Sequence, residues 1–169
     1  MNSLDDALNM ALDMEKKGYD LYKKASQKTL NKLGKTTLEA IARKELDHIN
    51  AIEEFAKHSL NKAIEMINPL EKIDYVKPIM DKLEKELNEN EAKDMDLEES
   101  YKAALKLEKD SYDLYKGLSE KMKEDQAKKF FQFLMGEENT HYELLNETLE
   151  YLDHPANWYR EQEKWIVEG

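Results

Sequence analysis

The chain has 169 residues, with 37 acidic side chains against 26 Lys and Arg and a formal net charge of −11 at pH 7. This acidity argues against nucleic acid and anionic membranes as partners, because both bind through clustered Lys and Arg. With no cysteine, five Gly and three Pro, the composition excludes disulfides, thiolate metal sites and iron–sulfur clusters, and it predicts an all-α single domain over residues 1–169.

The amino-terminal residues 1–17 are acidic where a signal peptide would be basic. No apolar run approaches the roughly 18 residues that a membrane span needs. We therefore expect a cytoplasmic protein without a membrane partner.

Two amphipathic helices are predicted in the first half, because inward positions alternate at spacings of four and three. The first helix is expected to have Ser3 as its N-cap, and the second to begin at a capping box over 36–39. The inward stripe of the first comprises Leu4, Leu8, Ala11, Glu15, Gly18, Tyr22 and Ala25. The stripe of the second comprises Leu38, Ile41, Glu45, His48, Ile52 and Phe55.

A long connection follows over about 59–95 and contains Pro69 and Pro78. Its length fits a crossover that runs the length of a bundle, as in ferritin-type topology. A short extra helix could form within residues 77–90.

The second half predicts two more amphipathic helices, of which one opens near Asp96 and the other ends before Pro155. The first carries Leu97, Tyr101, Ala104, Glu108, Ser111, Tyr115 and Leu118 on its stripe. The second carries Phe131, Leu134, Glu138, His141, Leu145 and Leu152. The tail over 154–169, with Trp158 and Trp165, is expected to pack on the bundle or on a partner subunit.

The two halves are an internal repeat at an offset of 93 residues. ALDMEKKGYDLYK, from Ala11, and ALKLEKDSYDLYK, from Ala104, share nine identities in thirteen positions, and two further Glu and His positions follow in the same register. The chain is therefore predicted to be a duplicated antiparallel helical hairpin, with repeats over about 3–58 and 96–153.

Four glutamates occupy the middle of apolar stripes, where unpaired charge is costly. Two of them begin Glu-x-x-His pairs, whose side chains share a helix face and can chelate an ion. Two divalent cations would balance four carboxylates. The general pattern of a Glu from each of two helices and a Glu-x-x-His from the other two is that of di-iron and di-manganese carboxylate bundles.

These motifs together resemble the rubrerythrin-like branch of the ferritin-like di-iron carboxylate proteins, over essentially the whole chain. The resemblance implies a ferritin-like four-helix bundle with two iron ions per chain, and manganese or zinc remain alternatives. The ligands that it implies are Glu45 and Glu138 as bridging carboxylates, Glu15 and His48 on one ion, and Glu108 and His141 on the other.

Two departures from the family bear on function. Rubrerythrins usually carry a rubredoxin domain whose cysteines hold an electron-transfer iron, so this cysteine-free chain is expected to take electrons from a separate donor protein. Rubrerythrins also carry a further Glu three residues after the ligand of the third helix, where this chain has Ser111. The remaining six-ligand shell is similar to that of bacterioferritin.

The resemblance implies a non-haem di-iron oxidoreductase that reduces hydrogen peroxide or O₂ and acts in oxidative stress. The alternatives are a ferroxidase or iron-handling protein, favoured by the six-ligand shell, and a non-enzymatic metal-binding bundle. A homo-oligomer, specifically a dimer, is expected by resemblance only.

Four tyrosines lie four and seven residues after ligand positions, close to the ligand face: Tyr19, Tyr22, Tyr112 and Tyr115. They are candidates for hydrogen-bond donors to the ligands or for redox tyrosines. The alternative role is core packing with a satisfied hydroxyl.

Other polar residues near the motifs are expected to be uninvolved. Glu137 should point about 100° away from its ligand neighbour, and His58 and His154 should lie at the surface. Gly136 marks either close packing near the site or a tolerated defect in a helix.

Overall fold

The computed structural model describes residues 4–57, 60–67 and 95–154. Within these ranges the chain is helical and has no strand: α1 (Leu4–Lys28), α2 (Lys32–Lys57), the short α3 (Leu60–Glu65), α5 (Met95–Lys121) and α6 (Asp125–Asp153). The prediction of an all-α fold is confirmed. None of the described helices is long and apolar enough to cross a membrane.

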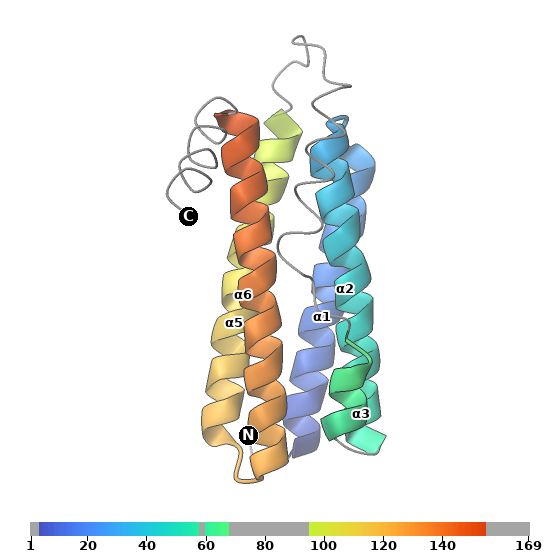
Figure 1. Cartoon of the computed structure of the whole chain (residues 1–169), viewed down its shortest axis with the longest axis vertical. Coiled ribbons are helices and arrows are strands. Elements are labelled where there is room, and N and C mark those ends of the chain that lie inside the picture. The colour runs from blue at the N-terminus through green and yellow to red at the C-terminus, as the bar shows by residue number, and fades with distance from the viewer. Residues whose placement is uncertain (1–3, 58–59, 68–94, 155–169) are drawn as a thin grey trace, which may run out of the picture.

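The four long helices form two hairpins that lie side by side (Figure 1). α1 packs mainly on α2 and α5 mainly on α6, with fewer contacts between the hairpins. α2 ends and α5 begins at opposite ends of the bundle, so the two helices run parallel (Figure 1). Two hairpins in this arrangement, with α2 and α5 parallel, are the ferritin-like topology.

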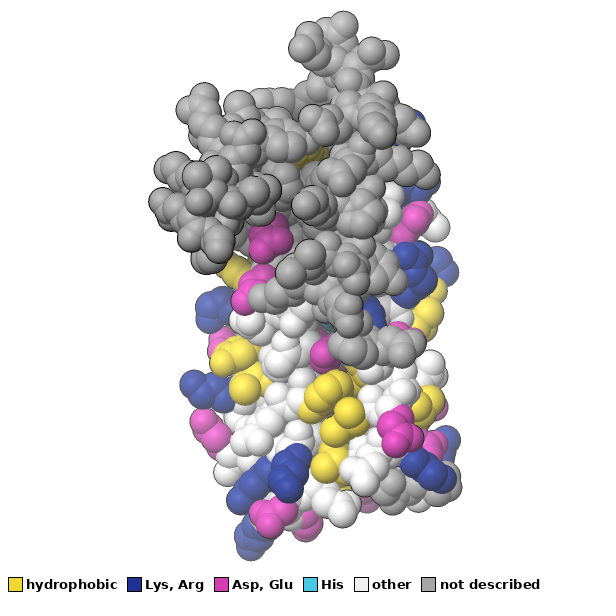
Figure 2. Space-filling view, in the orientation of Figure 1, with side chains coloured by type: hydrophobic (Ala, Val, Ile, Leu, Met, Phe, Trp, Pro, Cys, Tyr) yellow, Lys and Arg dark blue, Asp and Glu magenta, His cyan; other side chains and the backbone are white. Residues whose placement is uncertain are grey.

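The buried faces of the helices coincide with the predicted stripes except at Leu4, Phe55 and Leu152, which are half-buried. One apolar cluster includes Leu8, Ile52 and Phe131, and a second includes Ile41 and Leu145. Along each long helix the buried members of the two clusters are separated by about three turns, which carry the inward glutamates. The bundle therefore has a polar layer between two apolar layers, while Lys, Arg, Asp and Glu intermix on its outer flanks (Figure 2).

The start of α2 differs from the prediction. The helix begins at Lys32, and the Asn31 Oδ1 atom accepts a hydrogen bond of 2.9 Å from the Gly34 backbone N–H, as an N-cap does. Thr36 lies inside the helix and donates its hydroxyl to the Lys32 carbonyl at 2.8 Å. The capping box expected over 36–39 is therefore wrong, because Asn31 already supplies the cap one turn earlier.

The second hairpin follows its predicted bounds closely. α5 begins one residue before Asp96, and α6 ends at Asp153, ahead of Pro155. The His154 backbone N–H donates to the Glu150 carbonyl at 2.8 Å, which closes the last turn.

Parts of the predicted connection and tail fall outside the described residues. The first residues of the connection form α3, which packs on α2 and α6. The predicted Ser3 cap, the possible helix in 77–90, the placement of His58 and the docking of Trp158 and Trp165 lie outside the described ranges.

Candidate metal centre

The polar layer brings together the six residues that the sequence singles out as ligands. Each long helix supplies one Glu at the same level, and α2 and α6 each add a His one turn later. All six are at most 2% exposed: Glu15, Glu45, His48, Glu108, Glu138 and His141.

The Nδ1 atom of His48 faces carboxylates from three helices. It lies 3.2 Å from Glu15 Oε2, 3.3 Å from Glu138 Oε1 and 4.0 Å from Glu45 Oε2. The nearest neighbours thus come from α1 and α6 as well as from its own helix.

The Nδ1 atom of His141 has the matching environment in the other half. It lies 3.4 Å from Glu45 Oε1 and 3.5 Å from Glu108 Oε2. The two imidazole rings are stacked, with 5.2 Å between centroids. Glu45 therefore reaches both histidines through different oxygens, as a bridging carboxylate would.

The candidate ligand atoms form two overlapping groups whose members lie within 4.8 Å of one another. Glu45 belongs to both groups. One group consists of Glu15, Glu45 and His48, and the other of Glu45, Glu108, Glu138 and His141. Because Glu138 also contacts His48, both central carboxylates lie between the two histidines.

Burial strongly perturbs these acids. Burial, followed by the charge of Glu15, raises the pKa of Glu45 and of Glu138 well above the ordinary value. Burial would also raise the pKa of Glu15, but the facing His48 and the hydrogen bonds that Glu15 accepts lower it to about 2. The pKa of His48 is raised well above its ordinary value, because the surrounding carboxylates outweigh its burial. Without a cation, Glu45 and Glu138 therefore tend to be protonated, since four ionised glutamates would repel one another in this buried layer.

Several buried polar atoms in the layer have no hydrogen-bond partner in the described structure. They include Glu108 Oε2, Glu138 Oε1, His48 Nε2 and both ring nitrogens of His141. Buried polar groups are almost always satisfied in folded proteins. Carboxylate oxygens and imidazole nitrogens without hydrogen-bond partners, crowded in a buried layer, fit divalent cations such as Fe(II) or Mn(II) as ligand atoms.

Two of the four candidate tyrosines reach the glutamates. Tyr22 and Tyr115 are fully buried, and their hydroxyls donate hydrogen bonds to Glu108 Oε1 and Glu15 Oε1 respectively. Burial and the adjacent carboxylate raise the pKa of both phenols well above the ordinary value. Each tyrosine therefore orients a glutamate of the opposite hairpin and leaves the second oxygen of that glutamate facing a histidine.

The other two candidate tyrosines lie farther out. The Tyr19 hydroxyl accepts a hydrogen bond of 3.2 Å from Lys23 Nζ, near the surface. Tyr112 is half-buried and lines a cavity between α5 and α6. Neither side chain has a described hydrogen bond to a glutamate of the layer.

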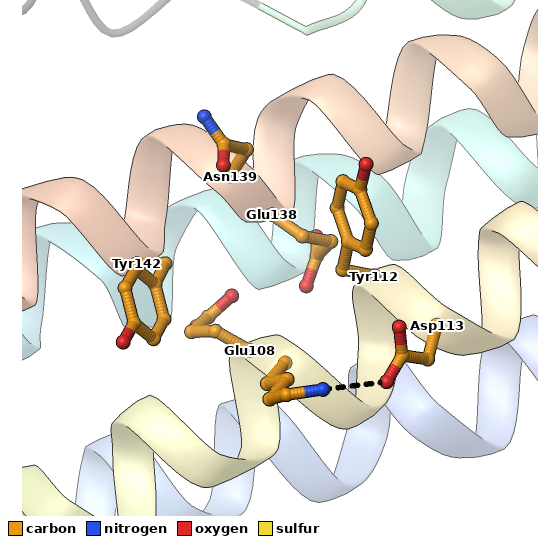
Figure 3. A pocket seen from close by; sticks show the side chains of 7 residues that line it. Glu108, Tyr112, Asp113, Glu138, Asn139 and Tyr142 are labelled. Atoms are coloured by element: carbon orange, nitrogen blue, oxygen red, sulfur yellow. Dashed lines mark hydrogen bonds and ion pairs between the residues drawn. The ribbon is translucent and has the colours of Figure 1, made fainter.

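This cavity has a volume of about 280 Å³ and extends from the surface to two glutamates of the polar layer. Glu108 and Glu138 point toward one another at its inner end, with Tyr112 and Tyr142 on either side (Figure 3). Its remaining lining residues are Lys109, Asp113 and Asn139. We call this cavity the α5–α6 pocket.

The sequence reasoning missed one charged contact. Glu137, expected to point away from the site, lies 3.7 Å through Oε2 from His48 Nε2, and its side chain is 13% exposed. The expectation was wrong because Glu137, although turned about 100° from Glu138 around the axis of α6, still faces α2. The only sequence signal is a charge difference between the repeats, in which Lys44 occupies the position that matches Glu137.

Two glycines on the long helices have different surroundings. Nothing lies within 4 Å of a Cβ built on Gly136, so close packing there is wrong and the tolerated defect remains. A Cβ on Gly18 would lie 3.1 Å from Glu45 Cδ and Oε2. Gly18 therefore makes room for the central carboxylate.

Inward carboxylates and imidazoles at one level of a four-helix bundle are typical of the ferritin-like carboxylate proteins. The family model of rubrerythrin matches residues 6–149. The chain belongs to the rubrerythrin family. No curated protein and no solved structure matches the chain.

Proposed function

We propose that the protein is a di-iron oxidoreductase that reduces hydrogen peroxide or O₂ with electrons from a separate donor protein. The observation that carries the proposal is the convergence of four buried glutamates on two facing histidine Nδ1 atoms, with unpartnered oxygens between them. Six residues are assigned as ligands: Glu15, Glu45, His48, Glu108, Glu138 and His141.

The residues of the chain have separable roles in this proposal. When bound, two ferrous ions would supply the two electrons that reduce one peroxide to two waters. Tyr22 and Tyr115 hold the outer glutamates in place through hydrogen bonds to their Oε1 atoms. The apolar layers on either side exclude water, and the α5–α6 pocket gives a small oxidant a path to Glu108 and Glu138.

A ferroxidase or iron-handling activity is the second candidate. It is favoured by Ser111, a buried residue at the position where rubrerythrins carry a further Glu. A metal-binding bundle without catalytic activity is the third. The sequence and the geometry of the glutamate layer are compatible with all three.

Anaerobic mixing of the iron-loaded, reduced protein with peroxide and with O₂ distinguishes these activities. We expect two irons per chain, faster oxidation by peroxide than by O₂, and turnover when a reductant is supplied. Uptake of many irons per chain would instead indicate iron storage. Iron binding without reaction toward either oxidant would leave the non-catalytic bundle.

Variants test the ligand assignment. Glu45→Ala and His141→Ala should each abolish binding of at least one iron, because each removes a donor from the centre of the layer. Lys106→Ala, on the exposed face of α5, is the control and should bind normally. Normal loading of both ligand variants would contradict the assignment.

We further propose that residues 1–169 form one domain and that the protein acts as a cytoplasmic homodimer. Limited proteolysis that leaves one resistant core would support the single domain, and a dimer mass by light scattering would support the homodimer. Fluorescent tagging of the protein in the source cells tests the cytoplasmic location.

A further inference from the structure

The internal repeat makes differences between the two halves of the metal centre easy to identify. The glutamates, the histidines and the two buried tyrosines all match at the offset of 93 residues. Their contacts match as well, since each tyrosine donates to the glutamate of the other hairpin. A residue near the centre that differs from its counterpart 93 positions away therefore makes the surroundings of the two proposed metal positions unequal.

The wall of the α5–α6 pocket is the first such difference. On α5, Lys109, Tyr112 and Asp113 have identical counterparts in α1. On α6, Asn139 and Tyr142 correspond to the apolar Leu46 and Ile49 of α2. The polar wall therefore occurs only in the second hairpin.

This pocket leads to two buried carboxylate oxygens that face histidines but have no hydrogen-bond partner among the described residues. Glu108 and Glu138 line its inner end while only 1% exposed, and Glu108 Oε2 and Glu138 Oε1 have no hydrogen-bond partner. The Asn139 amide donates to Glu143 Oε1 at 2.9 Å, along its own helix. Two carboxylate oxygens at the inner end of a pocket that opens to solvent are suited to receive a divalent cation.

The outer nitrogens of the two histidines are the second difference. His48 Nε2 faces the Glu137 carboxylate at 3.7 Å. The position that matches Glu137 holds Lys44, so the repeat supplies no second carboxylate behind His141. A carboxylate behind a ligating imidazole strengthens metal binding, and its loss typically costs 10- to 100-fold in affinity.

We propose that divalent cations enter through the α5–α6 pocket, so that the ion beside His141 exchanges readily while the ion beside His48 is held tightly and exchanges slowly. We call these the open and the closed position. The inference rests on the proposed two-metal site and adds which half of it communicates with solvent.

Release of Co²⁺ tests the inference without turnover. The protein loaded with two Co²⁺ per chain is mixed with excess EDTA, and the loss of cobalt absorption is followed. We expect two phases of equal amplitude whose rates differ at least tenfold. A single phase would overturn the proposal.

Exchanging the pocket walls assigns the fast phase. The double variant Asn139→Leu with Tyr142→Ile copies the α2 wall into α6 and should slow the fast phase at least fivefold, with two Co²⁺ still bound. The matched control, Leu46→Asn with Ile49→Tyr, should leave the fast phase unchanged. An unchanged fast phase in the α6 variant, or equal slowing in both variants, would refute entry through this pocket. If the double variant does not fold, Tyr142→Ile alone gives the same comparison.

Glu137 assigns the slow phase. Glu137→Gln should speed release of the slow ion about tenfold and leave the fast phase unchanged, and Glu137→Asp should restore much of the slow release. Equal effects on both phases, or none, would contradict the role of Glu137 at the closed position.

The outcomes separate this inference from the proposed function. Two kinetic phases without peroxide or O₂ reduction would refute the oxidoreductase and leave the two positions distinct. A single kinetic phase in a protein that reduces peroxide would refute the distinct positions and leave the oxidoreductase. A protein that binds no Co²⁺ would refute both.

Discussion

Gly18 sets the space available to the Glu45 carboxylate, because a Cβ there would lie 3.1 Å from that carboxylate. Gly18→Ala should raise the free energy of unfolding of the metal-free protein by up to about 1 kcal/mol, because Ala has a higher helix propensity than Gly. This gain requires the Glu45 side chain to move away from the new Cβ. A bound ion would resist that shift, so we expect about tenfold weaker Co²⁺ binding, measured by titration.

Gly136→Ala is the matched control for this substitution. Gly136 also lies inside a long helix, but nothing lies within 4 Å of a Cβ there. It should give the same gain of about 1 kcal/mol in the free energy of unfolding with unchanged Co²⁺ affinity. Equal affinity in both glycine variants would show that Gly18 has no steric role.

The buried acids predict how the metal-free protein responds to pH. Burial raises the pKa of Glu45 and Glu138 in the folded state, so the folded protein binds more protons than the unfolded chain above about pH 4.5. Their contribution to stability is therefore complete below that pH and is lost as pH rises through the raised pKa. His48, whose pKa is also raised, acts in the same direction above its unfolded pKa.

Chemical denaturation of the metal-free protein between pH 5 and 8 checks this expectation. Stability should fall with rising pH, and Glu138→Gln should reduce the slope because the amide does not titrate. Glu147→Gln, at an exposed position on the same helix, is the control and should keep the slope. A slope that is the same in the wild type and in Glu138→Gln would contradict the assigned protonation.

At this scale the sequence predicts the central residues but not their surroundings. Glu45 and His48 could be identified because they recur in register on apolar stripes. Glu137 could not, since helical spacing gives a direction around one axis and says nothing about which neighbouring helix lies there. The choice of Tyr22 over Tyr19 as the hydrogen-bond donor likewise depends on packing between the hairpins.

Among the elements, the start of α2 gives a direct test of the helix cap. Asn31→Ala should destabilise the protein by about 1 kcal/mol, because it removes the acceptor of the Gly34 N–H. Thr36→Ala is the control and should cost less, since Thr36 bonds only to a carbonyl within the helix. A larger loss at Thr36 than at Asn31 in urea denaturation would instead favour the capping box.

The long helices could be predicted because their inward positions repeat with helical spacing for about five to six turns. The start of α2 could not, because two cap-like sequences lie within five residues and periodicity does not choose between them. The start of α2 depends instead on how its first turn packs against α5. A Cβ on Gly34 would lie 2.7 Å from Leu97, and the Gly34 carbonyl accepts a hydrogen bond of 3.2 Å from Tyr101, which ties the first turn of α2 to α5.

For the whole molecule, metal binding should stabilise the bundle by linking its halves. The hairpins contact one another less than their own helices do, and four buried carboxylates meet where they join. Free Co²⁺ at about 100 times its dissociation constant should add about 2.7 kcal/mol to the stability, seen as a rise in Tm that EDTA reverses. Glu45→Ala is the control, and it should show little such rise; a full rise would place the stabilising ion elsewhere.

The topology of the molecule could be predicted because the repeat defines two hairpins and the length of the connection requires a crossover. The polar layer lies at one level because each of the four glutamates lies near the middle of its helix, 11 to 13 residues from the helix start. The differences between the halves, at Lys44 and at the α6 wall, acquire meaning only once α2 and α6 are seen to face each other across the layer.

The crossed tyrosine contacts bear on how such a chain could arise. Tyr22 donates a hydrogen bond to a glutamate of the second hairpin, and Tyr115 donates one to a glutamate of the first. Neither hairpin therefore contains both the donor and the acceptor of these hydrogen bonds. An ancestral single hairpin would have needed a second identical copy, related by a twofold axis, before gene duplication and fusion joined the two. Once fused, the halves were free to diverge, which a symmetric homodimer cannot do.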